Sequence, residues 1–190
     1  MKEILKGELV RLSEVDPEEH GKAYAVWNRD TEFKRLLDTS TRLHSAKSSI
    51  DFFKKLVGET APESYFFSIR AVEDNRLLGD IGLDVVNGWI GRNAFVGIGI
   101  GDRKDWGRGY GTQAMQLLLR YAFTEVNLNR VTLNVFEYNP RAIRSYEKSG
   151  FQHEGRVRGG LLKDGQRWDM IYMGILREEW LEHDRRPDRS

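Results

Sequence analysis

The stretch WGRGYGT, residues 106–112, places a glycine at every second position between a strand-like run and a helix-like run. Glycine tolerates a positive φ angle and lets the backbone approach a ligand closely. The first turn of the following helix would present unpaired N–H groups and a partial positive charge. The stretch therefore predicts a binding loop for a phosphate or pyrophosphate, with Arg103, Lys104 and Arg108 as nearby cations.

Spacing distinguishes several kinds of glycine loop. A nucleoside-triphosphate loop needs Lys-Ser or Lys-Thr after its last glycine, whereas Gly111 is followed by Thr112 and Gln113. A dinucleotide fold needs Gly-x-Gly-x-x-Gly early in a parallel sheet, with an acidic residue about 20 positions later. Here the loop follows several antiparallel strands, which suits neither class. A tight strand-to-helix turn without any ligand stays open as the alternative.

Three apolar runs precede the loop, at residues 65–69, 77–86 and 94–100. Turn-forming residues separate them, at 73–75 and again at 87–88. Short runs joined by such turns are typical of antiparallel strands. The middle of the chain is therefore predicted to form an antiparallel sheet.

The region before these strands is less regular. Residues 9–12 predict a short first strand, and Asp16 with Pro17 supplies an N-cap and a first-turn proline for a helix. A second helix is expected to end near Gly58, whereas residues 29–46 show no clean period.

After the loop, helix and strand patterns alternate. Residues 112–123 carry apolar side chains on one helical face, residues 131–136 alternate as a strand, and Asn139-Pro140 begins a helix that ends at Gly150. Two more strands are expected from residue 151 and over residues 168–175. Strand–helix–strand order implies at least one parallel pair.

These patterns predict one mixed α/β layer fold, without internal repeat or linker. We expect a single domain over residues 1–183 and a solvated charged tail at 184–190.

A second motif lies downstream of the loop: Asn139, Ala142, Ile143, Tyr146, Lys148, Gly150 and Phe151. With the loop, it resembles the GNAT superfamily of acyl-CoA-dependent N-acetyltransferases, whose pyrophosphate loop is usually written Arg/Gln-x-x-Gly-x-Gly/Ala. The resemblance extends from about residue 8 to residue 181, and the closing segment looks like the branch of ribosomal-protein-alanine and spermidine acetyltransferases. It implies a mixed, mostly antiparallel sheet of about seven strands flanked by helices, with acetyl-CoA between the strands near 95–100 and 131–136.

The sequence departs from this pattern at two places. The position that is usually Arg or Gln is Trp106, so side-chain help for a phosphate would come from Arg103, Lys104 or Arg108. Many relatives also carry a glutamate on the strand before the loop, as a candidate base. Residues 94–100 contain none, so the general base stays unidentified.

The resemblance implies that backbone N–H groups at 98–100 bond the pantetheine arm and the thioester oxygen. Gly97 and Gly99 would bulge this strand or separate it from its neighbour at 131–136. The expected contacts of acetyl-CoA are Ile98, Gly99, Ile100, Arg103, Lys104, Gly107, Arg108, Gly109, Tyr110, Gly111, Thr112, Asn139 and Arg144.

The same resemblance implies that Tyr146 is the general acid, since a phenol with a pKa near 10 can protonate a departing thiolate. On pattern alone, an aromatic three residues after Ile143 on a short helix more often simply packs. Asn139 is a good N-cap as well as a candidate contact of the cofactor, and the sequence leaves both roles open. Because the chain has no cysteine, the acyl group cannot rest on a thiol, and direct attack in a ternary complex is the simpler mechanism.

Composition limits the remaining classes of function. Thirty Lys and Arg against 29 Asp and Glu give a net charge of +1, which argues against nucleic-acid binding. The absence of cysteine fits a reducing cytoplasm and removes thiolate metal sites. The start of the chain lacks the apolar stretch of a signal peptide, and no run approaches the roughly 20 residues of a membrane span.

Other clusters are weak signals. The four histidines are scattered without metal-ligand spacing, so we expect no metal. Two groups of carboxylates could face a cationic substrate or simply be solvated: Asp80 with Asp84, and Asp30 with Glu32 and Asp38.

We therefore predict an N-acetyltransferase that moves an acetyl group from acetyl-CoA to a primary amine. The acceptor, a polyamine, another small amine or a protein N-terminus, is left open, as is a homodimer formed through late edge strands. Two alternatives are an acyl-CoA-binding sensory or scaffolding module without turnover and a dinucleotide-dependent oxidoreductase.

Overall fold

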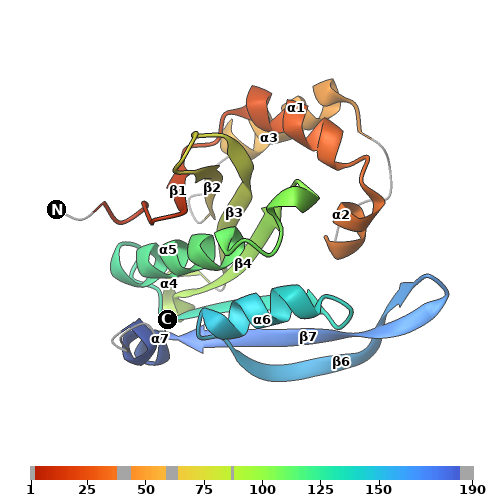
Figure 1. Ribbon diagram of the computed structural model, residues 1–190. Coiled ribbons are helices and arrows are strands. Elements are labelled where there is room, and N and C mark those ends of the chain that lie inside the picture. The colour runs from red at the N-terminus through yellow and green to blue at the C-terminus, as the bar shows by residue number, and fades with distance from the viewer. Residues whose placement is uncertain (1–2, 38–43, 59–63, 87, 185–190) are drawn as a thin grey trace.

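The core of the fold is a sheet of seven strands in the order β1-β2-β3-β4-β5-β7-β6 (Figure 1). A computed structural model describes residues 3–37, 44–58, 64–86 and 88–184. The strands are β1 (Val10–Ser13), β2 (Ser64–Ala71), β3 (Leu77–Val86), β4 (Asn93–Ile100), β5 (Arg130–Phe136), β6 (Gln152–Lys163) and β7 (Gln166–Leu176). The helices are α1 (Pro17–Trp27), α2 (Thr31–Leu36), α3 (Ala46–Gly58), α4 (Gly88–Gly91), the 3₁₀ turn η1 (Arg103–Asp105), α5 (Tyr110–Thr124), α6 (Pro140–Lys148) and α7 (Arg177–Asp184).

The predicted fold class is confirmed. Among the described strand pairs, only β4–β5 is parallel, and the other five are antiparallel. The predicted first helix begins where the sequence places it, because an Asp16 carboxylate oxygen accepts from the N–H groups of Glu18 (2.8 Å) and Glu19 (3.2 Å).

Strand β4 shows how the two faces of the sheet are covered. Val96, Ile98 and Ile100 point into the hydrophobic core, which α5 closes. Gly99, between them, faces the other side, where a β-carbon would lie 3.6 Å from the Tyr24 hydroxyl of α1. Figure 1 shows α5 in front of the sheet and α1 with α3 together at its upper end. The stripe that α5 buries comprises Ala114, Met115, Leu117, Leu118, Leu119, Ala122 and Phe123.

Strands β4 and β5 pair over only a short length. Asn93–Phe95 lie beside Arg130–Thr132, and no further pair follows in the described strands. On its other side β4 stays in register with β3 from Asn93 to Ile100 without a bulge. The strands therefore separate beyond Phe95, as the glycines of β4 predict, and the bulge offered as an alternative is not found.

The C-terminal part extends the sheet. Strands β6 and β7 form a long hairpin that extends to the right in Figure 1, and its register shifts between His153 and Gly155 and again between Val157 and Leu161. Helix α7 returns to the body of the protein, where Trp180 stacks on Phe123 with ring centroids 5.3 Å apart.

Three short helices were not predicted. Helix α2 lies in the stretch without a clean period, α4 begins at Gly88 where a turn was expected, and α7 follows β7. Asn87 of that expected turn lies outside the described residues. Of the expected tail, Asp184 ends α7 and 185–190 lie outside the described residues.

The close pairing of β3 with β4 gives a stability prediction. A β-carbon on Gly79 would lie 1.8 Å from the Gly99 carbonyl oxygen, so Gly79→Ala forces the strands apart. We expect a loss of about 2 kcal/mol or more in the free energy of unfolding, measured by urea denaturation. Gly97→Ala is the matched control, because its β-carbon would meet nothing within 4 Å. Equal stability of the two variants would contradict this reading of the β3–β4 contact.

Candidate active site

A pocket of about 420 Å³ opens where β4 and β5 separate. Its walls come from α2, the end of β4, the glycine loop with the start of α5, and α6. Of the residues predicted from sequence, the pocket brings together Ile98, Gly99, Ile100, Gly107, Gly109, Tyr110, Gly111, Thr112, Asn139, Arg144 and Tyr146.

The glycine loop takes the backbone conformation that its composition allows. Gly107 and Gly109 have φ angles of 76° and 85°, a region that L-residues rarely adopt. Gly109 is the N-cap of α5 and contributes no side-chain cap. The first N–H groups of α5, from Tyr110 to Thr112, therefore have no helical partner and lie at the positive end of the helix dipole. This is the geometry of an anion site.

The open edge of β4 carries unpaired backbone groups. Gly101 N–H donates to the Leu78 carbonyl (2.9 Å), so the antiparallel alternation directs the N–H and C=O groups of Ile98 and Ile100 away from β3. The Ile100 carbonyl accepts the Trp106 indole N–H at 2.7 Å. The two N–H groups of Ile98 and Ile100 thus face the gap toward β5. Gly99 differs, because its carbonyl oxygen faces β3.

Tyr146 lies on α6 and lines the pocket. Its ring meets Phe151 edge-on, with centroids 6.1 Å apart. Burial raises the pKa of Tyr146 to about 12, which keeps the phenol protonated at neutral pH. Helix α6 is attached to α5 by a hydrogen bond between the hydroxyls of Thr112 and Ser145 (2.8 Å).

Asn139 combines the two roles that the sequence left open. Its side-chain oxygen accepts from the Ala142 N–H (3.2 Å) and caps α6, and the residue also lines the pocket. Capping is directly visible, whereas a contact with a ligand stays a prediction.

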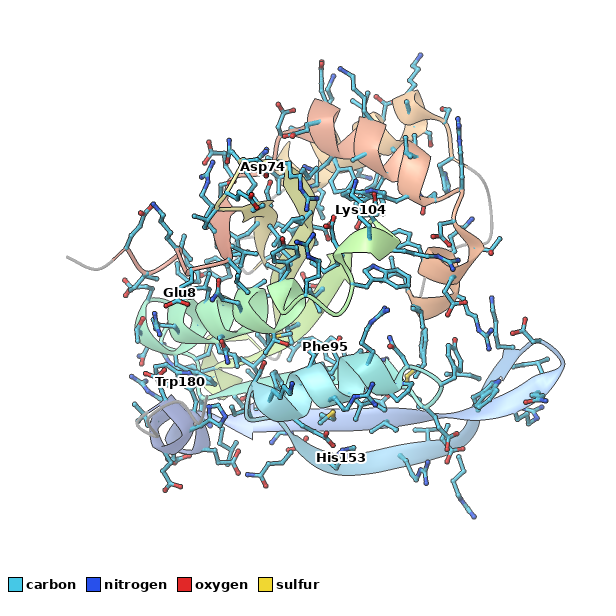
Figure 2. All side chains as sticks on the ribbon, viewed as in Figure 1. Glu8, Asp74, Phe95, Lys104, His153 and Trp180 are labelled. Carbon is cyan, nitrogen blue, oxygen red and sulfur yellow. The ribbon has the colours of Figure 1, made fainter. Side chains whose placement is uncertain are left out.

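Three predicted cations do not line the pocket. Arg103 is paired with Asp30, the N-cap of α2, and Lys104 with Asp102 (2.9 Å). Arg108 lies 3.7 Å from Asp105. In Figure 2, Lys104 lies toward α1 and away from α6.

Asp105 anchors the loop that carries these cations. Its carboxylate is buried and takes two hydrogen bonds of 2.6 Å from the Arg76 guanidinium. This bidentate pair joins the loop to Arg76, the residue directly before β3.

The pocket contains residues that sequence reasoning missed. Phe33, Leu36 and Leu37 form an apolar wall from α2, and Arg141 lines the opposite part from α6. The Arg141 guanidinium lies 3.9 Å from the centroid of Trp106. These two residues are 35 positions apart in the sequence, and no local pattern connects them.

The expected acidic groups take different places. Asp80 is buried and accepts the Tyr24 hydroxyl at 2.6 Å, whereas Asp84 is exposed beside Ser64 (2.8 Å). Asp30 is engaged by Arg103, and Asp38 lies outside the described residues. Neither carboxylate of β3 lines the pocket.

Judged by their side chains and helices alone, the described ranges lack two features. They contain no group of three or more His, Cys, Asp or Glu placed to hold a metal ion. None of their helices is long and apolar enough to cross a membrane.

Comparisons with known proteins agree with the fold and the loop. A family model described as "Acetyltransferase (GNAT) domain" matches residues 10–152. The uncharacterized N-acetyltransferase p20 of Bacillus licheniformis is 28% identical over 180 residues, covering 94% of this chain and 98% of that protein. Spermidine N(1)-acetyltransferase of Escherichia coli K12 is 33% identical over 84 residues, or 44% of this chain and 45% of that enzyme.

The fold also matches a solved structure. Spermidine N-acetyltransferase from Vibrio cholerae, in complex with CoA and spermine, has a TM-score of 0.79 at 23% identity. The match covers 92% of this chain and 99% of that one.

Asp80 gives a prediction for the pH dependence of stability. Burial raises its pKa from 3.8 to about 6, so the native state holds the proton more tightly than the unfolded chain. Asp80 thus favours folding at low pH, and this contribution is lost as pH rises from about 4 to about 6. In urea titrations, Asp80→Asn should gain about 3 kcal/mol relative to wild type between pH 4 and pH 7.

Asp84→Asn is the control, since Asp84 lies on the same strand but is exposed. A difference between wild type and Asp80→Asn that does not change with pH would contradict the buried-carboxyl account.

Proposed function

The chain belongs to the GNAT family of acetyltransferases, and we propose that it transfers an acetyl group from acetyl-CoA to a primary amine by direct attack in a ternary complex. One observation carries the proposal. The pocket joins the anion-binding start of α5, the open edge of β4 and the Tyr146 phenol in one space. In the proposal, the start of α5 binds the pyrophosphate, the N–H groups of β4 polarise the thioester carbonyl, and Tyr146 protonates the departing thiolate.

The residues of the pocket fit acetyl-CoA. Its pyrophosphate would lie against the N–H groups from Tyr110 to Thr112, where a helix start favours negative charge. Its pantetheine arm would extend along β4, where its amide carbonyl oxygens would accept hydrogen bonds from the N–H groups of Ile98 and Ile100. One of these N–H groups is suited to polarise the thioester carbonyl.

In the proposed reaction the amine nitrogen bonds to the carbonyl carbon and the carbon–sulfur bond breaks. The sulfur takes its proton from the Tyr146 hydroxyl, the amine loses a proton to water, and the Tyr146 phenolate takes a proton back from water before the next turnover. An isolated phenol with a pKa near 12 is a weak donor for a thiolate. The same burial destabilises a thiolate at this place and so raises the pKa of the CoA thiol as well. Proton transfer from Tyr146 to the sulfur is therefore less unfavourable than the pKa of the buried phenol and that of a thiol in water indicate.

The acceptor would enter from the side of α2. The named spermidine acetyltransferases support a polyamine as the first candidate, with other small amines and protein N-termini as further classes. Phe33, Leu36 and Leu37 would exclude water from the amine, which lowers its pKa and raises its neutral fraction.

We extend the proposal to the whole chain. One continuous sheet from β1 to β7 supports a single domain over residues 1–183. The lack of cysteine is compatible with work in the cytoplasm. Strand β6 is an exposed edge that would suit a homodimer.

A second candidate is a module that binds acyl-CoA as a sensory or scaffolding ligand. It is supported by the absence from β4 of a glutamate, the residue that serves as the candidate base in many relatives. Turnover separates the two, because a binding module would take up acetyl-CoA saturably and release no CoA thiol with any amine.

Tyr146→Phe tests the catalytic role. We expect kcat to fall about 100-fold, because the variant loses the proton donor but keeps the ring. The affinity for acetyl-CoA should change little. CoA-thiol release is measured with spermidine, an aminoglycoside, amino acids and Ala- or Ser-leading peptides.

Tyr172→Phe is the control, since Tyr172 is an exposed tyrosine of β7 outside the pocket. Unchanged kcat in Tyr146→Phe would remove Tyr146 from the mechanism. Saturable binding without turnover on the whole panel would favour the binding module.

A further inference from the structure

We propose that Arg141, held over the indole of Trp106, is the side chain that binds the pyrophosphate of acyl-CoA in this chain. The inference rests on the proposed function and assigns a cation to the anion site of that pocket. It differs from the sequence-based prediction, which gave this role to Arg103, Lys104 or Arg108.

The cations of the loop are already engaged. Arg103 is paired with Asp30, Lys104 with Asp102, and Arg108 with the buried Asp105. To bind a phosphate, each would have to share or leave a carboxylate, which reduces what it contributes. They also lie outside the lining of the pocket.

Arg141 is in the opposite situation. It lines the pocket, and no ion pair or hydrogen bond of its guanidinium is found among the described residues. Burial lowers the pKa of this guanidinium, the charge of the Glu32 carboxylate partly offsets that shift, and the group stays charged at neutral pH. A partly desolvated cation without a carboxylate contact is the group that gains most from an anionic ligand.

Trp106 places this cation. The indole N–H donates to the Ile100 carbonyl at 2.7 Å, so the ring is fixed to the end of β4. The Arg141 guanidinium lies 3.9 Å from the ring centroid, within the range of a cation–π contact. Stacking uses the face of the guanidinium and leaves its N–H edge for a bidentate contact with phosphate oxygens.

The position of Arg141 in α6 completes the site. It belongs to the first turn of that helix, directly after Pro140, and the start of α5 lines the same pocket. A pyrophosphate there would meet the first turns of two helices with a guanidinium beside them. Arg144 and Lys148 also line the pocket from further along α6, but they are exposed and therefore gain less from an anionic ligand than the half-buried Arg141.

The experiment compares two ligands. Binding of CoA is measured by calorimetry, and turnover is measured with acetyl-CoA and with S-acetyl-pantetheine, which lacks the pyrophosphate. Arg141→Met should weaken CoA binding about 10- to 100-fold. Its rate with S-acetyl-pantetheine should equal that of wild type. Arg158→Met, at an exposed arginine of β6, is the control and should leave both unchanged.

Trp106→Leu tests whether the Trp106 indole is the platform, that is, the surface that holds the Arg141 guanidinium in place. It should weaken CoA binding in the same direction, and the double variant with Arg141→Met should lose much less than the sum of the two free-energy changes. Full additivity would show that Trp106 does not act through Arg141 and would overturn the platform.

Three further results would overturn the assignment. Unchanged CoA binding in Arg141→Met, with binding by wild type intact, would reject Arg141 and leave the proposed function standing. An equal loss with S-acetyl-pantetheine would show that Arg141 only positions α6. If wild type itself binds no CoA, the proposed function fails together with this inference.

Discussion

The separation of β4 from β5 is the constraint on which the rest of the site depends. The two strands pair only from Asn93 to Phe95, while β4 remains fully paired with β3. Had the parallel pair continued, the N–H groups of Ile98 and Ile100 would be satisfied within the sheet and the pocket would be closed. Gly99 suits this arrangement, because it places no side chain on the face where Tyr24 of α1 lies.

Ion pairs and hydrogen bonds then fix the elements around this gap. Arg103 joins the loop to Asp30 at the start of α2, and the hydroxyls of Thr112 and Ser145 join α5 to α6. Asp105, buried with Arg76, holds the loop itself. The loop cations are engaged in this framework, which is why we propose that the phosphate-facing charge comes from a different helix. Trp106, unusual for the loop pattern, provides the surface on which that charge rests.

Much of this could be predicted from sequence, and the reason is that the signals were local. The apolar runs gave the strands, Asp16 and Asn139 marked helix starts, and the glycine spacing indicated the anion site. Helix α2 was missed because its six residues are too few to show a period. The partners of Arg103 and Arg141 were missed because contacts between residues far apart in the sequence depend on how the elements pack.

The central claim is that acyl-CoA binds along the open edge of β4. Amide hydrogen exchange by NMR, with and without CoA, tests it most directly. The account predicts that the amides of Ile98 and Ile100 exchange fast in the free protein and become protected with CoA. The amides of Gly97 and Gly99, which face β3, should be protected in both states. Unchanged exchange at Ile98 and Ile100 on saturation with CoA would contradict the account.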